Sequence, residues 1–479
     1  MRNVLPPGYH MRRVRALCAA WLLLAATAAL AEPLLLPCAV VAGLNDACPS
    51  WIGVYDGGGE DQPMDSAASP DGRRVYVTGT AAGGATGIDA VTMAYDAASG
   101  ARLWAARWDS GLPPDATDST YDVEVTPDGE NVLVAGAACE AIADGNTCDL
   151  VVLAYAASTG EPLWSSVVHG PGLDAAFALA VDQGLVYVGG RSWQLGTGVD
   201  VLTLALDVAT GDEVWRRRHH GGFGFDGASD LVLAGGTVVV TGPSQGKTGQ
   251  QSDIVTLAYD AATGAPRWQA RREGTIGQLL GSGIAVGGDL VAVSGVSAGA
   301  SPLLPDYLVL AYDLATGAPR WTATWDGPTA SVDQVTALQV APSGDRVYVT
   351  GMSRNPDYDA VTLAYDGATG AQRWLARYDG PIGDGDAAFA LAQAPGRDEL
   401  YLLGSSYMGA AVGYQHVLVA YDASSGAQRW KVQHQGQGLR RLATPMSLAV
   451  AGDRVVASAQ IADPTGLNPD TATLAYARP

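Results

Sequence analysis

The stretch Ala258-Tyr-Asp-Ala-Ala-Thr-Gly264-Ala-Pro-Arg-Trp268 occurs seven times along the chain with small changes. Close copies occupy residues 311–321 and 364–374, and looser copies occupy 94–104, 154–164, 205–215 and 420–430. The tryptophans that end these copies are separated by 60, 51, 53, 53, 53 and 56 residues. A regular period of this length indicates a propeller or a solenoid, in which each repeat forms one structural unit.

Each repeat contains four short segments that are typical of β-strands. In the repeat that starts at Ser331, they cover residues 335–340, 346–350, 359–365 and 372–378. They are rich in β-branched and aromatic residues, and clusters of Asp, Gly, Pro and Ser separate them. The third segment is almost continuously apolar, as expected for a strand buried between neighbouring sheets. The sequence therefore predicts an all-β chain.

The two ends of the chain carry complementary halves of one repeat. Residues 51–55 read as a fourth strand with no third strand before it, and residues 471–476 as a third strand with no fourth strand after it. Joining these halves would close a ring and leave only short edges. We predict an eight-bladed β-propeller of four-stranded antiparallel blades, whose last blade is completed by the N-terminal strand. The repeat tryptophan then occurs eight times, at Trp51, Trp104, Trp164, Trp215, Trp268, Trp321, Trp374 and Trp430.

The A-x-D-x-x-T-G-x-x-x-W pattern resembles the tryptophan-docking repeat of the PQQ-like (quinoprotein-like) β-propellers, over residues of about 48–477. The turns at 69–79 and 126–129 are also similar to the bacterial secreted YVTN and SBBP-type propeller repeats. The resemblance implies that each Trp docks between adjacent blades. The turn Asp of the pattern can accept backbone hydrogen bonds. It is present as Asp96, Asp207, Asp260, Asp313, Asp366 and Asp422, and is replaced by Ala156 in one copy.

The N-terminus has the features of a secretory signal peptide. A basic segment, Met11-Arg-Arg-Val-Arg15, precedes a short apolar stretch at 16–28 and the small-x-small site Ala29-Leu-Ala31. We therefore expect a signal peptide (1–31), a lead-in segment (32–47) and a single propeller (48–479) in an exported, periplasmic or extracellular protein. Removal of residues 1–31, which hold four arginines and no acids, changes the net charge from −21 to −25. Such a charge argues against nucleic-acid partners.

The cysteines of the exported chain form two closely spaced pairs. An even number of cysteines in an exported protein predicts disulfides, here Cys38–Cys48 and Cys139–Cys148. The second pair lies between the second and third strands of the repeat with the longest tryptophan spacing. Metal binding is the alternative, but neither pair has CxxC spacing or a nearby histidine.

Two series of aspartates recur outside the turn pattern. The first lies in the loop between the fourth strand and the next first strand, and its six carboxylates are candidates for a ring that binds Ca²⁺ or a ligand: Asp61, Asp118, Asp174, Asp226, Asp333 and Asp386. The alternative is that each residue caps its own loop by accepting backbone N–H groups. The second series precedes the third strand and is interpreted as turn residues: Asp89, Asp149, Asp200, Asp253, Asp306, Asp359 and Asp470.

The sequence favours a binding role over catalysis. The basic segment Arg216-Arg-Arg-His219-His220 is interpreted as a solvated outer edge rather than a metal site, and no H-E-x-x-H motif occurs. We expect an exported, non-catalytic propeller that acts as a monomeric binding or interaction scaffold for a protein or carbohydrate ligand, without a membrane span. The alternatives are a PQQ-dependent dehydrogenase or a secreted glycan-active propeller enzyme. The family resemblance allows a quinoprotein, but those enzymes carry an adjacent Cys-Cys pair, which this chain lacks, so bound PQQ is not expected.

Overall fold

The computed structural model describes residues 49–478 except 85, 114–115, 143–144, 183, 223, 247–250, 275–276, 279–280, 302–303, 329–330, 384, 410–412, 435–440 and 463–468. The expected signal peptide (1–31), the lead-in segment (32–47) and the Cys38–Cys48 pair lie outside the described residues. No helix long and apolar enough to cross a membrane occurs in the described part of the chain.

The chain forms eight blades of antiparallel strands, and in the first seven blades the four main strands follow one another in sequence. The first four blades comprise β2 (Gln62–Ala68), β3 (Arg74–Ala82), β4 (Ile88–Asp96) and β5 (Arg102–Trp108); β6 (Thr117–Val125), β7 (Asn131–Ile142), β8 (Gly145–Ala156) and β9 (Pro162–Val168); β10 (Ala175–Val181), β11 (Leu185–Gln194), β12 (Gly198–Asp207) and β13 (Glu213–His219); and β14 (Asp230–Ala234), β15 (Thr237–Gln245), β16 (Gln251–Asp260) and β17 (Pro266–Arg272), with β18 (Gly277–Gln278) beside β16. A single parallel bridge between Ile88 and Thr117 links blades 1 and 2.

The remaining blades repeat this pattern up to the last one, which takes its fourth strand from the N-terminus. They comprise β19 (Gly281–Gly287), β20 (Leu290–Ser301), β21 (Leu304–Asp313) and β22 (Pro319–Trp325); β23 (Asp333–Val340), β24 (Arg346–Arg354), β25 (Tyr358–Asp366) and β26 (Gln372–Tyr378); β27 (Ala387–Gln393), β28 (Glu399–Tyr407), β29 (Tyr414–Asp422) and β30 (Gln428–His434); and β31 (Arg441–Ala451), β32 (Arg454–Ala462), β33 (Asp470–Ala477) and β1 (Trp51–Tyr55).

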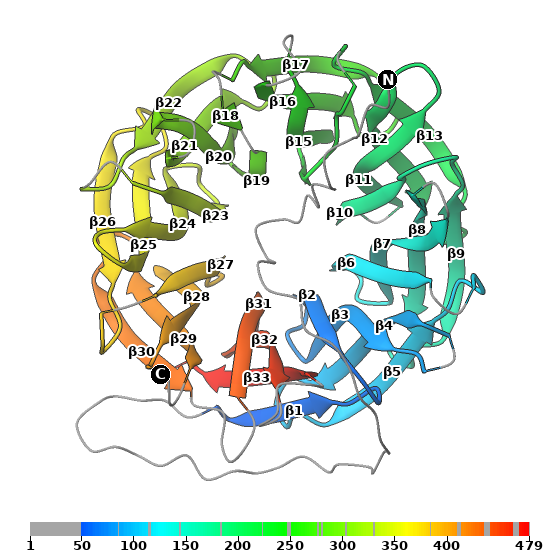
Figure 1. Ribbon diagram of the computed structural model, residues 1–479, viewed down its shortest axis with the longest axis horizontal. Helices are drawn as coiled ribbons and strands as arrows, with labels where there is room; N and C mark the ends of the chain where they lie inside the picture. The colour runs from blue at the N-terminus through cyan, green and yellow to red at the C-terminus, as the bar shows by residue number, and fades with distance from the viewer. Residues whose placement is uncertain are drawn as a thin grey trace, which may run out of the picture.

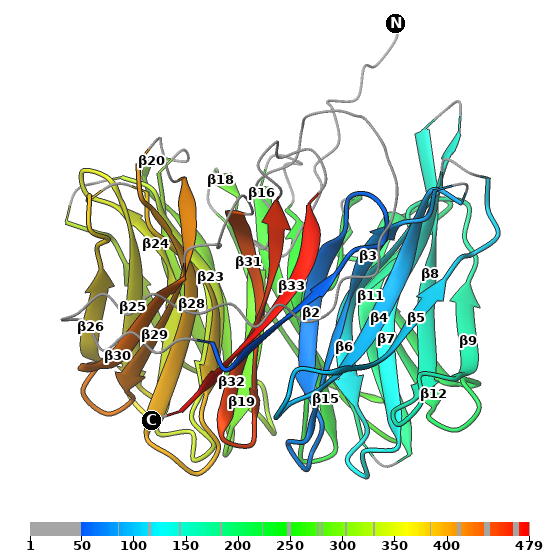
Figure 2. The ribbon, with the colours of Figure 1, turned by 90° about the horizontal axis from the view of Figure 1, so that it is seen from below.

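The blades stand around a central axis, with first strands near the axis and fourth strands at the rim (Figure 1). Because strands alternate in direction, the fourth-to-first connections and the second-to-third hairpins share one face, here called the loop face. The first-to-second and third-to-fourth turns share the opposite face, here called the turn face. The two faces are the upper and lower ends of the side view (Figure 2).

The predicted closure of the ring is confirmed. Strand β1 pairs antiparallel with β33, in a register that places Trp51 opposite Ala475 and Tyr55 opposite Thr471. In Figure 2 the two strands, blue and red, run side by side across the molecule. This pairing provides the last sheet with its outer strand, so the edge of β33 is not exposed.

The core lies between neighbouring blades. Third strands are buried along almost their whole length, as in β25, because both of their faces pack against adjacent sheets.

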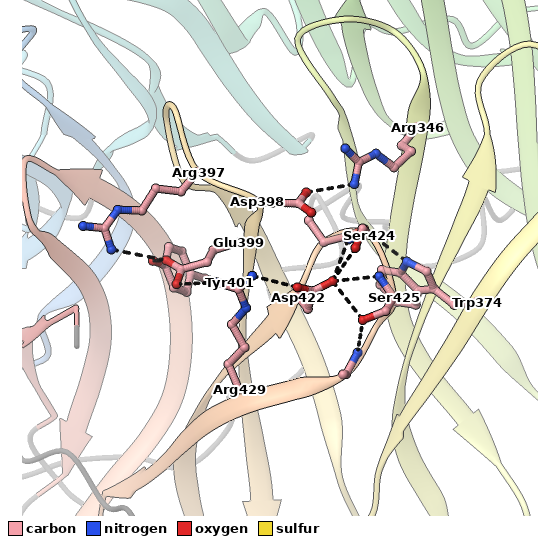
Figure 3. A network of polar contacts seen from close by, with 12 residues as sticks. Arg346, Trp374, Arg397, Asp398, Glu399, Tyr401, Asp422, Ser424, Ser425 and Arg429 are labelled. Carbon is pink, nitrogen blue, oxygen red and sulfur yellow. Dashed lines mark hydrogen bonds and ion pairs between the residues drawn. The ribbon is translucent and has the colours of Figure 1, made fainter.

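The turn Asp residues accept backbone hydrogen bonds, as the sequence predicts. Asp422 accepts hydrogen bonds from the backbone N–H and side chain of Ser425, and the guanidinium of Arg429 binds its other oxygen (Figure 3). Each of these turns is therefore fixed by its own side chains on the turn face.

The repeat tryptophans dock on the next blade as the family resemblance implies. The indole Nε1 of Trp215 donates to the carbonyl oxygen of Ala261 at 2.9 Å. Equivalent bonds of 2.8–3.2 Å are made by Trp51, Trp104, Trp164, Trp268, Trp321 and Trp374. The acceptor belongs to the turn between third and fourth strands. Blade 8 has no such turn, because its fourth strand comes from the other end of the chain, and Nε1 of Trp430 has no partner among the described residues.

The second-to-third hairpin of blade 2 contains the predicted disulfide. Cys139 of β7 lies directly opposite Cys148 of β8, and their sulfur atoms are bonded. The bond ties together two strands that are longer than their counterparts in blades 1 and 3. A disulfide at this position is consistent with folding in an oxidising compartment.

Candidate functional site at the blade junctions

The first Asp series lies where the chain crosses from one blade to the next on the loop face. These six residues, the junction aspartates, are all buried, with 0–2 % of their surface exposed: Asp61, Asp118, Asp174, Asp226, Asp333 and Asp386. Their burial follows from the fold, since each crossing loop lies over the seam between two sheets. A buried carboxylate is costly unless hydrogen bonds or a cation compensate it.

Backbone N–H groups compensate most of these carboxylates. The second residue after each fourth strand is small, and its backbone N–H points back at the junction aspartate. Gly57 donates to Oδ2 of Asp61 at 2.5 Å, and Gly221 donates to Oδ2 of Asp226 at 2.7 Å. Ser110, Gly327 and Gly380 donate in the same way to Asp118, Asp333 and Asp386. Five of the six residues therefore cap their own loops.

Each junction aspartate meets a member of the second Asp series, here called the strand-start aspartates. Asp61 lies with Asp470, Asp226 with Asp200, Asp333 with Asp306 and Asp386 with Asp359, in clusters whose ligand atoms are within 4.8 Å of one another. Asp118 and Asp174 interact electrostatically with Asp89 and Asp149. Among the described residues, no such cluster contains two junction aspartates. The six residues are thus divided among separate junctions, and metal binding by them stays a prediction.

A third recurrent position completes the clusters. It directly follows the fourth strand and holds an Asp in three of them, at Asp56, Asp326 and Asp379, and His220 in the fourth. The sequence interpretation of 216–220 as a solvated edge fits Arg216, which pairs with Glu213, and the exposed His220, but it did not anticipate that His220 also pairs with Asp200. The missed signal was the regular recurrence of Asp or His immediately before the loop glycine.

Basic side chains neutralise many of the strand-start aspartates. Arg107 pairs with Asp89 at 3.1 Å and Arg271 with Asp253 at 2.6 Å. Arg377 pairs with Asp359, and His169 with Asp149. Each of these arginines lies three residues after its repeat tryptophan. At that position blade 5 has Thr324 and β1 has Val54, so the clusters around Asp306 and Asp470 lack this arginine.

Burial raises the pKa of carboxyl groups in the two clusters that lack an arginine. Desolvation raises the pKa of Asp61 to about 7, against the lowering effect of the hydrogen bonds from Gly57 and Ala82. The pKa of Asp306 is raised to about 6, first by desolvation and then by the charges of Asp326 and Asp333. A cation bound at either cluster would favour the ionised form. The oxygen-only donor set suits a hard cation such as Ca²⁺.

A separate group of aromatic and apolar side chains, two of them exposed, lies on the loop face between blades 6 and 7. Tyr407 and Tyr414 flank the tip of the β28–β29 hairpin, with ring centroids 5.1 Å apart. Both pack over Gly385 of the crossing loop, where an added Cβ would lie 3.2 Å from the Tyr414 hydroxyl. Ile382 of the same loop is 50 % exposed and Tyr414 is 49 % exposed. We call Ile382, Tyr407 and Tyr414 the aromatic patch.

Two stretches match the G-x-S-x-G pattern of hydrolase nucleophiles, at 242–246 and 295–299. Their serines lie in second strands. In the strand register, Ser244 lies opposite Asp253 of the third strand and Ser297 lies opposite Asp306. The nucleophile elbow requires a strand–turn–helix, which neither stretch forms. These serines are a feature of the repeat, because Ser353 pairs with Asp359 in the same way.

Solved structures share the fold. The quinohemoprotein alcohol dehydrogenase from Comamonas testosteroni is 13 % identical, with a TM-score of 0.55 over 91 % of this chain and 78 % of that chain. Sqt1 from Chaetomium thermophilum, bound to the N-terminus of the ribosomal protein L10, is 13 % identical, with a TM-score of 0.56 over 88 % and 98 %. The Dos1 propeller is 11 % identical, with a TM-score of 0.57 over 90 % and 96 %. At these identities the likeness concerns the fold alone.

The sequence itself matches a known family. No curated protein sequence matches the chain. The PQQ-like family model described as outer membrane protein assembly factor BamB matches in three overlapping stretches, at residues 88–247, 149–389 and 305–476. These stretches together cover more than half of the chain and include the repeat tryptophans from Trp104 to Trp430. The protein therefore belongs to this family of PQQ-like β-propellers.

Proposed function

We propose that the protein is an exported, non-catalytic binding scaffold that holds a protein or carbohydrate ligand on its loop face. Export to the periplasm or the cell exterior is supported by the signal-peptide features of residues 1–31 and by the Cys139–Cys148 disulfide. The propeller sheets hold the loops rigidly while leaving loop sequences free to vary, which is the usual arrangement of a binding surface.

The aromatic patch is the observation that carries the proposal. Tyr414 and Ile382 each expose about half of their surface. Tyr414 packs against Tyr407 and over Gly385 of the crossing loop, and Ile382 of that loop lies beside Gly409 of the hairpin. Rigid, exposed aromatic rings bind sugar faces and apolar protein side chains at low entropic cost. The turn face, in contrast, repeats the same Asp-centred turn in most blades, as expected for a structural element.

The charge of the protein narrows the ligand class. The chain is strongly acidic, and the carboxylates of the junction clusters lie on the same face as the aromatic patch. The resulting negative electrostatic potential favours a cationic or polyhydroxylated ligand over nucleic acid or another polyanion. We expect the scaffold to act as a monomer.

The comparisons support a protein partner at the level of analogy. The family model takes its description from an outer membrane protein assembly factor, and Sqt1 is a propeller that binds the N-terminus of another protein. The likeness to the quinohemoprotein alcohol dehydrogenase keeps a quinoprotein enzyme as the rival function. That rival requires a bound quinone and is tested separately in the Discussion.

The proposal is tested by removing the patch and recording which ligands are lost. The double variant Ile382→Ser/Tyr414→Ala and the parent are compared on a glycan array and in cross-linking to exported proteins of the same cell. Leu163→Ser is the matched control, because Leu163 is equally exposed, at 47 %, but lies on the rim strand β9. Loss of a ligand in the double variant alone supports the proposal. A ligand that all three proteins retain places binding elsewhere and contradicts it.

A further inference from the structure

We propose that Asp200, His220 and Asp226 bind one divalent transition-metal ion, such as Zn²⁺, at the junction of blades 3 and 4. Asp200 begins the core of β12, His220 directly follows β13, and Asp226 lies in the loop that crosses to blade 4. The backbone N–H of Asp226 donates to the carbonyl oxygen of Val199 at 2.7 Å, which holds the loop against β12. This inference is independent of the proposed ligand on the aromatic patch.

The donor atoms have the spacing of metal ligands. Nδ1 of His220 lies 3.2 Å from Oδ1 of Asp200 and 3.8 Å from Oδ2 of Asp226. Zn–N and Zn–O bonds are about 2.0–2.2 Å long, so neighbouring ligand atoms of a tetrahedral site are roughly 3.3–3.5 Å apart. The three side chains therefore surround a point that a zinc-sized ion can occupy with little rearrangement.

A buried carboxylate oxygen without a hydrogen bond faces this point. Asp200 is 4 % exposed, and Thr197 donates to its Oδ2 at 2.9 Å. Its Oδ1, the oxygen that faces His220, has no hydrogen-bond partner among the described residues. A buried carboxylate oxygen without a hydrogen bond is costly, and the exposed His220 is the ion-pair partner it has here. A metal ion bound at Oδ1 would remove this cost.

The surrounding residues orient the ligands as outer-shell groups do in metal sites. Gly221 donates its N–H to Oδ2 of Asp226 at 2.7 Å, and the hydroxyl of Ser244 donates to Oδ1. Such hydrogen bonds fix the carboxylate before the ion arrives. The side chain of His220 is 36 % exposed, whereas that of Asp226 is fully buried, so the ion can enter from the loop face past the imidazole.

The other junctions explain why the site forms here. In blade 6, Arg377 pairs with Asp359 and supplies the positive charge itself. In blade 3, the equivalent Arg218 donates to the hydroxyl of Ser192 at 3.2 Å, and among the described residues Arg218 forms no ion pair with Asp200. Of the four clusters in the described structure, only this one contains a nitrogen ligand. Imidazole together with carboxylate selects Zn²⁺ and its neighbours over Ca²⁺.

The test uses the untagged exported chain, freed of metal with EDTA and kept in excess Ca²⁺, which occupies oxygen-only clusters. Co²⁺ is added as a spectroscopic probe and its visible d–d absorption is followed, and Zn²⁺ binding is measured by calorimetry. His220→Ala is the decisive variant, because this exposed side chain can be removed without disturbing the loop cap. Ser244→Ala removes the hydroxyl that donates a hydrogen bond to the proposed ligand Asp226. His169→Ala is the matched control, since His169 pairs with Asp149 at the same position of blade 2.

We expect one bound ion per chain in the parent and in His169→Ala, and none at this site in His220→Ala with an unchanged circular dichroism spectrum. Ser244→Ala should weaken binding by roughly 10-fold. If the metal-free parent binds neither Co²⁺ nor Zn²⁺, His220 serves only as an ion-pair partner and the proposal is wrong. Undiminished binding in His220→Ala would equally overturn it.

Discussion

The indole ring of Trp215 lies directly over Gly264 of the next blade, where an added Cβ would stand 2.6 Å from the ring. Gly264 has a φ of 66°, so it allows both the left-handed turn and the close approach of the ring. The same contact recurs between Trp51 and Gly100 and between Trp374 and Gly426. The repeat couples each tryptophan to a glycine of the next turn, which explains why both are present in nearly every copy.

Gly264→Ala should therefore destabilise the protein through two effects. The left-handed backbone disfavours any side chain, and the new Cβ would overlap the ring of Trp215. Together we expect a loss of about 2–4 kcal/mol in the free energy of unfolding, measured by urea denaturation. Gly58→Ala is the control, because Gly58 also has a positive φ, 97°, but no atom within 4 Å of the added Cβ. An equal loss in both variants would show that ring contact contributes nothing.

Removal of the closing strand should have a larger effect. Deletion of residues 51–55 would expose the edge of β33, which now pairs with β1 along five residues, and unpaired edges promote aggregation. We expect aggregation or a marked fall in melting temperature, followed by light scattering and calorimetry. A truncated chain that stays soluble with the melting temperature of the parent would contradict closure by β1.

The Cys139–Cys148 disulfide leads to one prediction about the stability of the protein and one about its export. Replacing Cys139 and Cys148 together by Ser should lower the free energy of unfolding by about 2–3 kcal/mol in the chain-entropy account of a short loop. Peptide mapping of the exported protein under non-reducing conditions should recover the Cys139–Cys148 link, and the same map tests the expected Cys38–Cys48 link. Free thiols at all four positions would contradict both the pairing and export.

The ring could be predicted from the sequence because its determinants are local and repeated. Each turn Asp, docking Trp and β-strand lies within one copy of the repeat, and the two half-copies at the ends identify the closure. The partner of Trp430 could not be anticipated in this way. Its acceptor would belong to a third-to-fourth turn that blade 8 lacks, because closure joins Trp51 to the strand of Tyr476 from opposite ends of the chain.

The junction clusters were only half predictable. The sequence located both Asp series. However, each cluster brings together a residue of a fourth-to-first crossing loop and a residue at the start of a third strand, and these meet only at the seam between two folded blades. Asp61, for example, meets Asp470 at the ring closure. The composition of each cluster also depends on a single rim position, occupied by Arg377 in blade 6 and by Thr324 in blade 5. Neither series by itself revealed that position.

Stability should depend on pH through the cluster of blade 5. The pKa of Asp306 is raised to about 6, so between about pH 4 and pH 6 the folded protein holds a proton that the unfolded chain releases. The contribution of Asp306 is favourable below this window and is lost as the pH rises through it. Asp306→Asn, which stays neutral, should be more stable than the parent at pH 8 by roughly 1 kcal/mol after allowance for solvent screening, and nearly equal at pH 4.5.

Asp359→Asn is the matched control for this experiment, because Asp359 occupies the same position in blade 6 but pairs with Arg377. Desolvation raises the pKa of Asp359 as well, but Arg377 partly offsets this effect. Asp359→Asn also leaves the guanidinium without its carboxylate, so it should be less stable than Asp306→Asn at pH 8. Calorimetric melting of all three proteins at both pH values compares them directly. Destabilisation by Asp306→Asn at pH 8 would mean that Asp306 contributes as a hydrogen-bond acceptor rather than as an unfavourable charge.

The choice between a binding scaffold and a quinoprotein enzyme is decided most directly by titrating the purified protein with PQQ in the presence of Ca²⁺, followed by fluorescence. A scaffold should show no saturable quenching of its tryptophans and no PQQ-dependent oxidation of alcohols. A soluble stoichiometric complex with bound quinone, and above all a complex that reduces an electron acceptor when alcohol is added, would contradict the non-catalytic function proposed here.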